Sequence, residues 1–486
     1  MLIYAILAVP LAAGAVTAVV PWRPWLGWLT AAANGTVLLL GIWLAAGAVH
    51  RHPLGALHGV LRADALSAFM VVVIGAIAVL ASGQSVRYLS AETGQGRCTA
   101  RHATLYTALV QVFVSCMLAA VLAANLGVMW VAVEATTIAT TFLVGHRRTD
   151  AALEASWKYV VICSVGIALA FLGTVLFYFA GLHATGHPAG SLNWTALMAA
   201  GHHLDPGVVR LAMGLLVLGY GTKVGLAPMH SWLPDAHSQA PAPVSALMSG
   251  VLLTVAFYAL LRFKAIADLA LGAGYPRALL TVAGLASLLV AASLLLTQRD
   301  YKRMLAYHSI EHMGLIALGA AAGSSLAIAA VLLHILGHGL AKGVLFLASG
   351  EILLAEGTSE IAKVPALLSR RPVLGGIFGF GLVALLGLPP FSLFVSELNM
   401  VRAEFAAGLG WAAAIALACM AVIFAAVMAH GRHLLLGDAP PQGARGVTPR
   451  LVAVPLAAGL AACAFLGVSA WPLQPLLQAA ARVVVS

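Results

Sequence analysis

Long apolar stretches follow one another along almost the whole chain, separated by short polar connections. Because a helix needs about 20 apolar residues to cross the hydrocarbon core of a bilayer, these stretches predict about fourteen membrane-spanning helices. The chain is 62% hydrophobic and only 9% charged, whereas soluble domains carry about 25% charged residues. We therefore predict an all-α, polytopic membrane protein. The predicted spans lie near residues 2–20, 25–48, 65–82, 104–123, 126–144, 158–182, 208–230, 241–262, 277–296, 304–322, 325–354, 373–400, 411–436 and 450–473.

The distribution of Lys and Arg predicts how the chain lies in the membrane. Numbered along the chain, the connections between successive spans differ in charge. Most of the Lys and Arg residues, including Arg147–Arg148 and Lys302–Arg303, fall in the first, third and other odd-numbered connections. By the positive-inside rule these connections face the cytoplasm and both termini lie outside. The 262–277 connection does not fit this pattern, because it is even-numbered but basic. The net charge of +10 is thus explained by membrane anchoring, and we expect no nucleic-acid partner. We expect a multi-pass protein of a cytoplasmic membrane, surrounded by the lipid bilayer.

The sequence shows no recognisable set of cofactor ligands. Its five cysteines form no C-x-x-C pair and mostly lie in apolar stretches, where they behave as small hydrophobic residues. There is no pattern of iron–sulfur or nickel ligands and no phosphate-binding loop of the form G-x-x-x-x-G-K-[ST]. We therefore expect no metal or cofactor in this chain, and no ATP-driven pumping.

Two spans contain prolines that interrupt a continuous helix. The seventh is interrupted within GLAPMHSWLPDAHSQAPAP (225–243), and the twelfth at Pro389–Pro390. Proline removes a backbone donor, and a membrane tolerates this only where protein or water satisfies the freed groups. Paired broken helices are typical of transporters built from inverted repeats. We therefore predict two inverted five-helix repeats. The predicted units are three N-terminal helices in 1–103, repeats in 104–262 and 277–436, and a C-terminal helix in 437–486.

Three ionisable residues, His334, His338 and Lys342, lie on one face of the apolar eleventh span, in LLHILGHGLAKGVLFLASG. Residues four apart on a helix stay on nearly the same face, so the three groups form a line about 12 Å long. Charge in lipid is costly, and such residues usually face a protein interior or a water-filled path. A line of titratable groups in a membrane predicts a proton relay.

Three further charged residues lie at membrane depth. Glu134 is in the fifth span, Lys223 directly precedes the break of the seventh, and Glu397 follows the break of the twelfth by about two turns. We interpret Glu134 and Lys223 as partners, because moving a carboxylate away from a buried lysine weakens the hold of that lysine on its proton. The alternative is a structural ion pair.

The histidines allow other interpretations. His334 and His338 have the spacing of two zinc ligands on a helix, but no Cys, Asp or Glu nearby in the sequence completes such a site. His334 could also be a hydrogen-bonded core residue. The segment HSIEH (308–312) matches the H-x-x-E-H pattern of a class of zinc peptidases. Its place at the start of an apolar span argues against a peptidase and makes Glu311 and His312 candidates for a cytoplasmic proton entry.

Several long motifs resemble one family of membrane proteins. Glu134 and four stretches of the chain resemble the antiporter-like subunits of respiratory complex I, Mrp-type cation/proton antiporters and group 4 nickel–iron hydrogenases. The four stretches are KVGLAPMHSWLPDAHSQAPAPVSALMSG, QRDYKRMLAYHSIEHMGLIALG, HILGHGLAKGVLFLASGEI and GLPPFSLFVSEL. Within this family the chain is most similar to the branch that contains component F of hydrogenase 4, a formate hydrogenlyase-type complex. The resemblance implies fourteen helices with two inverted repeats. It also implies the site: an input pair, Glu134 and Lys223; central relay groups, His334 and His338; the lysine of the second half-channel, Lys342; and an exit-side group, Glu397.

One position departs from the family pattern. Many complex I relatives carry a lysine in the eighth span where this chain has Thr254. A threonine can hold a water molecule but cannot titrate. Either water, Thr254 and Tyr258 bridge the gap between Lys223 and His334, or pumping is weakened.

The resemblance and the buried charges together predict a proton-translocating membrane subunit of a multisubunit redox complex. Nickel–iron and iron–sulfur centres are expected in partner subunits, both membrane and peripheral. Two alternatives stay open. The same residues would serve an Mrp-type sodium/proton antiporter subunit, and Thr254 favours a scaffold that transports no ion.

Overall fold

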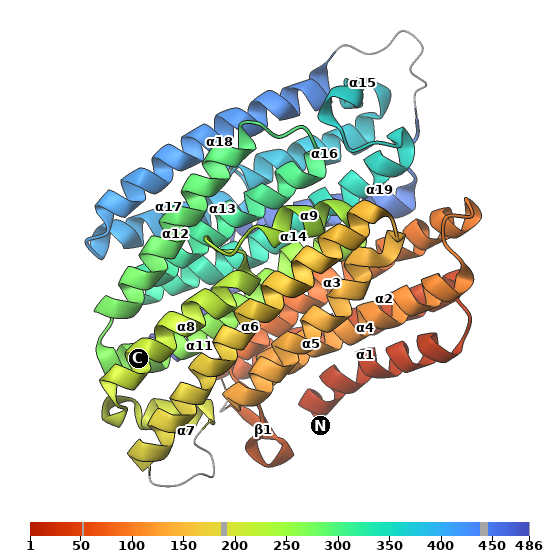
Figure 1. The fold of residues 1–486 in the computed structure, drawn as a ribbon. Helices are drawn as coiled ribbons and strands as arrows, with labels where there is room; N and C mark the ends of the chain where they lie inside the picture. The colour runs from red at the N-terminus through yellow and green to blue at the C-terminus, as the bar shows by residue number, and fades with distance from the viewer. Residues whose placement is uncertain (51–52, 186–191, 438–445, 486) are drawn as a thin grey trace.

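The computed structural model describes residues 1–50, 53–185, 192–437 and 446–485, most of them helical. Within this part of the chain, twelve helices are long and apolar enough to cross a membrane. The helix α13 (Tyr301–Ala322) and the discontinuous pair α16 (Pro372–Leu385) and α17 (Ser392–Ala406) lie among them (Figure 1). The prediction of an all-α, multi-pass membrane protein with about fourteen spans is therefore confirmed. The twelve are α1 (Leu2–Val19), α2 (Pro24–His50), α3 (Ala65–Gly94), α4 (Ala100–Leu122), α5 (Leu126–Val144), α6 (Asp150–Thr185), α8 (Pro206–Val224), α10 (Ala242–Leu247) continuing through the π-helical turn Met248–Leu252 into α11 (Leu253–Leu271), α12 (Gly274–Leu295), α14 (Ser325–Glu356), α18 (Gly410–Leu436) and α19 (Arg450–Val468).

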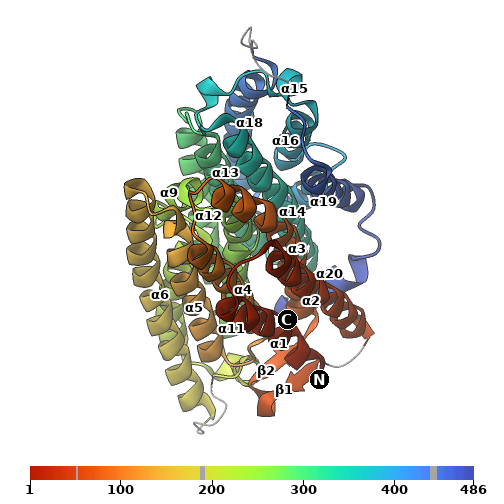
Figure 2. The same cartoon turned by 90° about the vertical axis from the view of Figure 1, so that its right-hand side faces the viewer.

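Two of the helices that carry ionisable residues, α14 and the continuous α10–α11, lie at the centre of the bundle. In α14 and in α10–α11, the whole apolar window long enough to cross a membrane is buried inside the protein. Figure 2 shows α14 within the bundle, with α6 at one edge and α19 towards the other. The peripheral α6 exposes Leu153, Trp157 and Val161 at a helical spacing. Apolar side chains such as these can face lipid, whereas histidine and lysine must be shielded from it.

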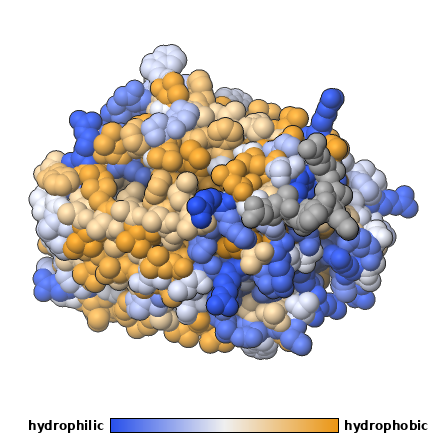
Figure 3. Space-filling model, turned by 90° about the horizontal axis from the view of Figure 1, so that it is seen from above, coloured by the Kyte–Doolittle hydropathy of each residue, from blue (hydrophilic) through white to orange (hydrophobic). Residues whose placement is uncertain are grey.

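The outer surface of the bundle is largely apolar, as expected for contact with lipid. Figure 3 shows hydrophobic side chains over much of one face, while hydrophilic side chains gather mainly towards its right-hand side. Exposed apolar side chains include Phe380 on α16 and Trp411 on α18. Such a surface would be unfavourable in water and is stable in a bilayer.

Both predicted helix breaks are present. After α8 the chain turns at Gly225, whose φ of +85° favours glycine, and continues as the short helix α9 (Trp232–Gln239). Between α16 and α17 it turns at Gly387, with φ +62°, and passes through the predicted proline pair. Each break leaves backbone groups available at depth in the bundle, where side chains can use them.

Some elements were not predicted. A two-stranded antiparallel hairpin, β1 (Leu54–Ala56) and β2 (Leu61–Ala63), follows α2, and the short helix α7 (Trp194–Ala199) lies at the same end of the bundle (Figure 1). A further helix, α20 (Gln474–Val484), packs against α3 and α14 with one apolar face. These elements are too short to give a spanning signal in the sequence. The division into two inverted repeats remains a prediction.

Candidate functional site

Lys223 lies in the last turn of α8, directly before the helix break, and is fully buried. Its ammonium group donates hydrogen bonds to the Thr137 hydroxyl at 2.8 Å and to the Tyr159 hydroxyl at 2.7 Å. The Tyr159 hydroxyl lies 2.6 Å from Thr140 Oγ1, and the Tyr159 ring centre lies 4.9 Å from the ammonium nitrogen. The buried charge is therefore held by neutral hydroxyl groups and an aromatic ring.

Glu134 is connected to Lys223 through one hydroxyl group. Thr137, one turn further along α5, donates its hydroxyl proton to Glu134 Oε2 over 3.1 Å while it accepts from Lys223. Donors and acceptors thus follow one another without a gap from ammonium to carboxylate. The predicted partnership of Glu134 and Lys223 is present but indirect, because Thr137 lies between the two charged groups.

A second polar cluster forms where α13, α14 and α17 meet. Nδ1 of His312 on α13 lies 2.9 Å from Nε2 of His334 on α14. Nδ1 of His334 lies 3.0 Å from Ser396 Oγ on α17. The His338 ring centre is 5.0 Å from that of His312, and all four side chains are buried. His334 therefore links three helices.

Helix α13 supplies more of this cluster than the sequence suggested. His308 stacks on His312 with 5.0 Å between ring centres, and its Nδ1 lies 2.6 Å from Glu311 Oε2 in an ion-pair contact that lacks hydrogen-bond geometry. The Lys342 ammonium donates to the backbone carbonyl of Leu305, also on α13. The three groups predicted on α14, His334, His338 and Lys342, are therefore joined in one cluster by ionisable side chains of α13. Glu311 and His312, the candidates for a cytoplasmic entry, lie in this cluster.

Glu397 forms the wall of a cavity beside the second cluster. The cavity has a volume of about 590 Å³, is lined also by Glu311, and is otherwise mostly apolar, with Phe394 and Phe424 among its walls. Gly387, at the break before α17, packs against the Glu397 carboxylate so closely that a Cβ atom there would overlap it. The break thus makes room for a carboxylate next to an open space, and the exit-side role of Glu397 stays a prediction.

His237 lies between the two clusters and was missed by the sequence analysis. Its ring stacks on Phe346 of α14 at 5.3 Å and lies 6.3 Å from Trp232, which packs 4.9 Å from Tyr159. His237 is fully buried and neither of its ring nitrogens has a hydrogen-bond partner. A buried imidazole with two available nitrogens can accept and release a proton. Its signal in the sequence was its position within the break, in PDAHSQAP (234–241).

The hydroxyl groups of Thr254 and Tyr258 both donate to backbone carbonyls, so the bridge expected as one of two possibilities for this region stays a prediction that depends on water. The Thr254 hydroxyl donates to the Val251 carbonyl of its own helix at 2.8 Å. The Tyr258 hydroxyl donates to the Val121 carbonyl at 2.8 Å and lies 3.2 Å from Ser67 Oγ. Tyr258 therefore belongs to a different cluster, which contains Arg262.

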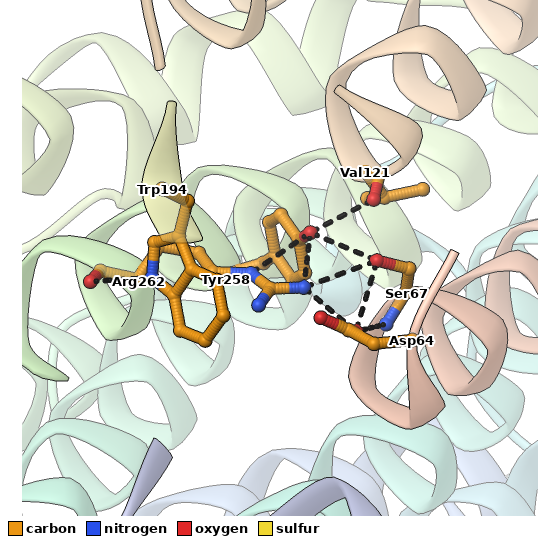
Figure 4. Close-up of polar contacts among 6 residues, drawn as sticks. All are labelled: Asp64, Ser67, Val121, Trp194, Tyr258 and Arg262. Carbon is orange, nitrogen blue, oxygen red and sulfur yellow. Dashed lines mark hydrogen bonds and ion pairs between the residues drawn. The ribbon is translucent and has the colours of Figure 1, made fainter. Parts of the chain in front are cut away.

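Figure 4 shows this third cluster, which joins the start of α3 to the middle of α11. Arg262 Nη2 donates to Asp64 Oδ1 at 2.8 Å, to the Tyr258 hydroxyl at 2.9 Å and to Ser67 Oγ at 3.1 Å. The guanidinium carbon also lies 4.5 Å from the centre of the Trp194 ring. Both members of the ion pair are almost completely buried. Arg262 and Asp64 therefore fix the N-terminal helices to α11.

The family of the chain follows from comparison with known proteins. The family described as NADH:quinone oxidoreductase/Mrp antiporter, TM, matches residues 123–424, a range that contains all six predicted relay residues. The chain belongs to this family. The resemblance seen in the motifs is thereby confirmed.

Two curated members of the family show how the chain relates to hydrogenase components. It is 41% identical over 344 residues to a hydrogenase-4 component F homolog of Methylacidiphilum infernorum (isolate V4), with 71% of this chain and 72% of the relative covered. It is 32% identical over 351 residues to hydrogenase-4 component B of Escherichia coli (strain K12), of which it spans about half.

Solved structures share the fold of the whole chain. A chain of the membrane-bound sulfane sulfur reductase, an archaeal respiratory membrane complex, has a TM-score of 0.89 at 23% identity, with 100% of this chain and 98% of that chain covered. A chain of the Mrp complex from Dietzia sp. DQ12-45-1b has a TM-score of 0.87 at 21% identity, with the same coverage. At this identity the similarity concerns the fold alone.

Proposed function

We propose that this chain is the proton-translocating membrane subunit of a multisubunit redox complex of the hydrogenase 4 or complex I type. The observation that carries the proposal is the hydrogen-bonded sequence from Glu134 through Thr137 to the buried Lys223. A hydroxyl group between two charged groups can accept a hydrogen bond on one side and donate one on the other, so it connects Lys223 to Glu134. The family membership supports the same role.

In the first step, movement of Glu134 sets the charge of Lys223. With the carboxylate in place, the ammonium is stabilised in the protein interior. When a neighbouring subunit draws the carboxylate away, an effective penalty of several kcal/mol per buried ion favours release of the lysine proton. Moving one charge against 100 mV requires about 2.3 kcal/mol, so a switch of this size is sufficient.

In the second step, the proton passes from the Lys223 site to the second cluster. His237 and water molecules beside it are the proposed link, in the place where the family lysine is replaced by Thr254. His334, His338 and Lys342 then carry the proton, and Glu397 releases it into the adjoining cavity. His312, in hydrogen-bonding distance of His334, takes part in this relay.

The proposal includes the setting of the subunit. Nickel–iron and iron–sulfur centres reside in partner subunits, and electron transfer there drives Glu134 through contacts between membrane subunits. The chain lies in the cytoplasmic membrane of a bacterium or archaeon with both termini outside. Protons are the transported ion, with sodium as the alternative.

The decisive test of the relay is Lys223→Ala in the intact complex, reconstituted in vesicles with a pH-sensitive dye inside. We expect coupled proton movement to be abolished while the complex still assembles. Lys264→Ala is a matched control, because Lys264 is a buried lysine paired with Asp268 at 2.5 Å on α11, outside the relay. Normal proton pumping by Lys223→Ala would refute the assignment.

The two alternatives have different signatures. An Mrp-type sodium/proton antiporter subunit would be purified together with small membrane proteins and no redox subunit, which mass spectrometry of the tagged complex would reveal. A scaffold that transports no ion would leave pumping unchanged in variants of Lys223, Lys342 and Glu397. Deletion of the chain would then still prevent assembly.

A further inference from the structure

Three ionisable side chains from three helices converge at one point in the second cluster. One nitrogen each of His312 on α13 and His334 on α14, and a carboxylate oxygen of Glu397 on α17, lie within 4.8 Å of one another. The sequence analysis found no acidic ligand near His334 and therefore expected no metal. In the fold this argument against a metal no longer holds, because Glu397 and His312, distant in the sequence, lie next to His334.

Two imidazoles and one carboxylate are a ligand set that zinc uses when it keeps one position open. In tetrahedral coordination with bonds of about 2.0–2.1 Å, two ligand nitrogens lie about 3.3 Å apart. His312 Nδ1 and His334 Nε2 are 2.9 Å apart in the structure. A widening of about 0.4 Å therefore admits a metal ion in place of the proton that the two rings share.

The surroundings of these ligands fit a metal ion as well. The second ring nitrogen of His334 lies 3.0 Å from Ser396 Oγ, the type of outer contact that orients a metal-ligating histidine. Glu311 lines the same cavity as Glu397, so two carboxylates are available to balance a divalent charge.

We propose that His312, His334 and Glu397 form a binding site for a zinc-type divalent transition metal ion, which competes with the proton and blocks the relay. Magnesium and calcium are excluded because they require mainly oxygen ligands. The fourth position, facing the cavity, is taken by water or by Glu311. Binding is independent of the proposed function, whereas the block of proton movement rests on it.

The test measures zinc bound to the purified, intact complex after desalting, as zinc per copy of this chain. We expect His312→Gln and Glu397→Gln each to lose one zinc equivalent relative to the wild type. His338→Gln is the matched control, because His338 lies in the same cluster but outside the three ligands, and it should keep that equivalent. Equal zinc content in the wild type and both ligand variants overturns the site.

A second variant covers the case in which the ligand variants do not assemble. Ser396→Ala removes the outer contact of His334 and should weaken zinc binding by about 10–100-fold. X-ray absorption at the zinc edge should show nitrogen and oxygen ligands at about 2.0–2.2 Å, and sulfur ligation would refute the site. Zinc bound at this site without any slowing of proton movement would support the site but count against the relay.

Discussion

The buried ion pair between Asp64 and Arg262 gives the sharpest prediction for stability. Asp64 has two roles: it accepts the charge-assisted hydrogen bond of Arg262 at 2.8 Å, and it caps α3 by accepting from the Ser67 amide at 3.0 Å. Asparagine is as good a helix cap as aspartate, so Asp64→Asn removes the charge and keeps the cap. The variant therefore isolates the electrostatic contribution of the pair.

The expected magnitude follows from the geometry. With charge centres about 4 Å apart and an effective dielectric constant of about 20, the attraction is about 4 kcal/mol. Removing one partner of a buried pair typically costs about 3–5 kcal/mol, because the other charge is left uncompensated. We therefore expect Asp64→Asn to lower the free energy of unfolding by about 3–4 kcal/mol. The exposed pair Lys363–Glu360 provides the control, since Glu360→Gln should change stability by less than about 1 kcal/mol.

The assay is unfolding of the purified protein in mixed micelles with increasing SDS, for the wild type, Asp64→Asn, Arg262→Met and the double variant. We expect the double variant to be at least about 2 kcal/mol more stable than the sum of the single losses predicts, because it leaves no unpaired charge. Additive losses, or a loss below about 1 kcal/mol for Asp64→Asn, would contradict the reasoning.

The same pair predicts a pH dependence. Burial opposes ionisation of Asp64, which precedes the α3 span, but the charge and hydrogen bonds of Arg262, with those of Ser67, outweigh burial and hold the pKa of this carboxyl below its usual range. Its contribution to stability is present above the usual value of about 3.9 and is lost as the pH falls through the lower, folded-state pKa. The difference between the wild type and Asp64→Asn should therefore stay constant from about pH 5 to 8 and decrease only below about pH 4.

Three further predictions concern single side chains. Tyr159→Phe removes one acceptor of the Lys223 ammonium and should reduce stability by about 1–3 kcal/mol, measured by SDS unfolding, and slow proton movement in vesicles. Gly387→Ala places a Cβ against the Glu397 carboxylate at a φ of +62°. It should lower the free energy of unfolding by about 1–3 kcal/mol or more and slow proton release. A variant with unchanged stability and proton release would show that this break does not position Glu397. Burial raises the pKa of the Cys98 thiol, which lies between α3 and α4, so maleimide labelling followed by mass spectrometry should be slow at pH 7 and accelerate above the ordinary thiol pKa.

Much of the fold could be predicted from hydropathy and proline. A long apolar stretch in a membrane protein has essentially one solution, a helix with all its backbone hydrogen bonds made internally, so the spans were found. The breaks at 225–243 and at Pro389–Pro390 were found because proline cannot continue the hydrogen-bond pattern. The hairpin β1–β2 and α20 were missed, since their short segments are stabilised by packing on the bundle.

The candidate site was only half predictable. Charged residues such as Glu134 and Lys223 stand out in an apolar stretch, because only a specific environment can hold them there. The hydroxyl groups of Thr137 and Tyr159, which connect the two, do not stand out, since threonine and tyrosine occur in any span. His237 was missed for a related reason, because it lies within the break, where polar residues are expected.

The sequence by itself determined that this chain crosses a membrane many times, where its helices break, and which family it belongs to. These properties depend on composition, on local backbone chemistry and on long motifs. All three can be read from residues that are neighbours in the sequence. Only the tertiary structure decided that Thr137 separates Glu134 from Lys223, and that His312, His334 and Glu397 meet. Contacts between helices distant in the sequence depend on how apolar side chains pack, and packing is a property of the whole bundle.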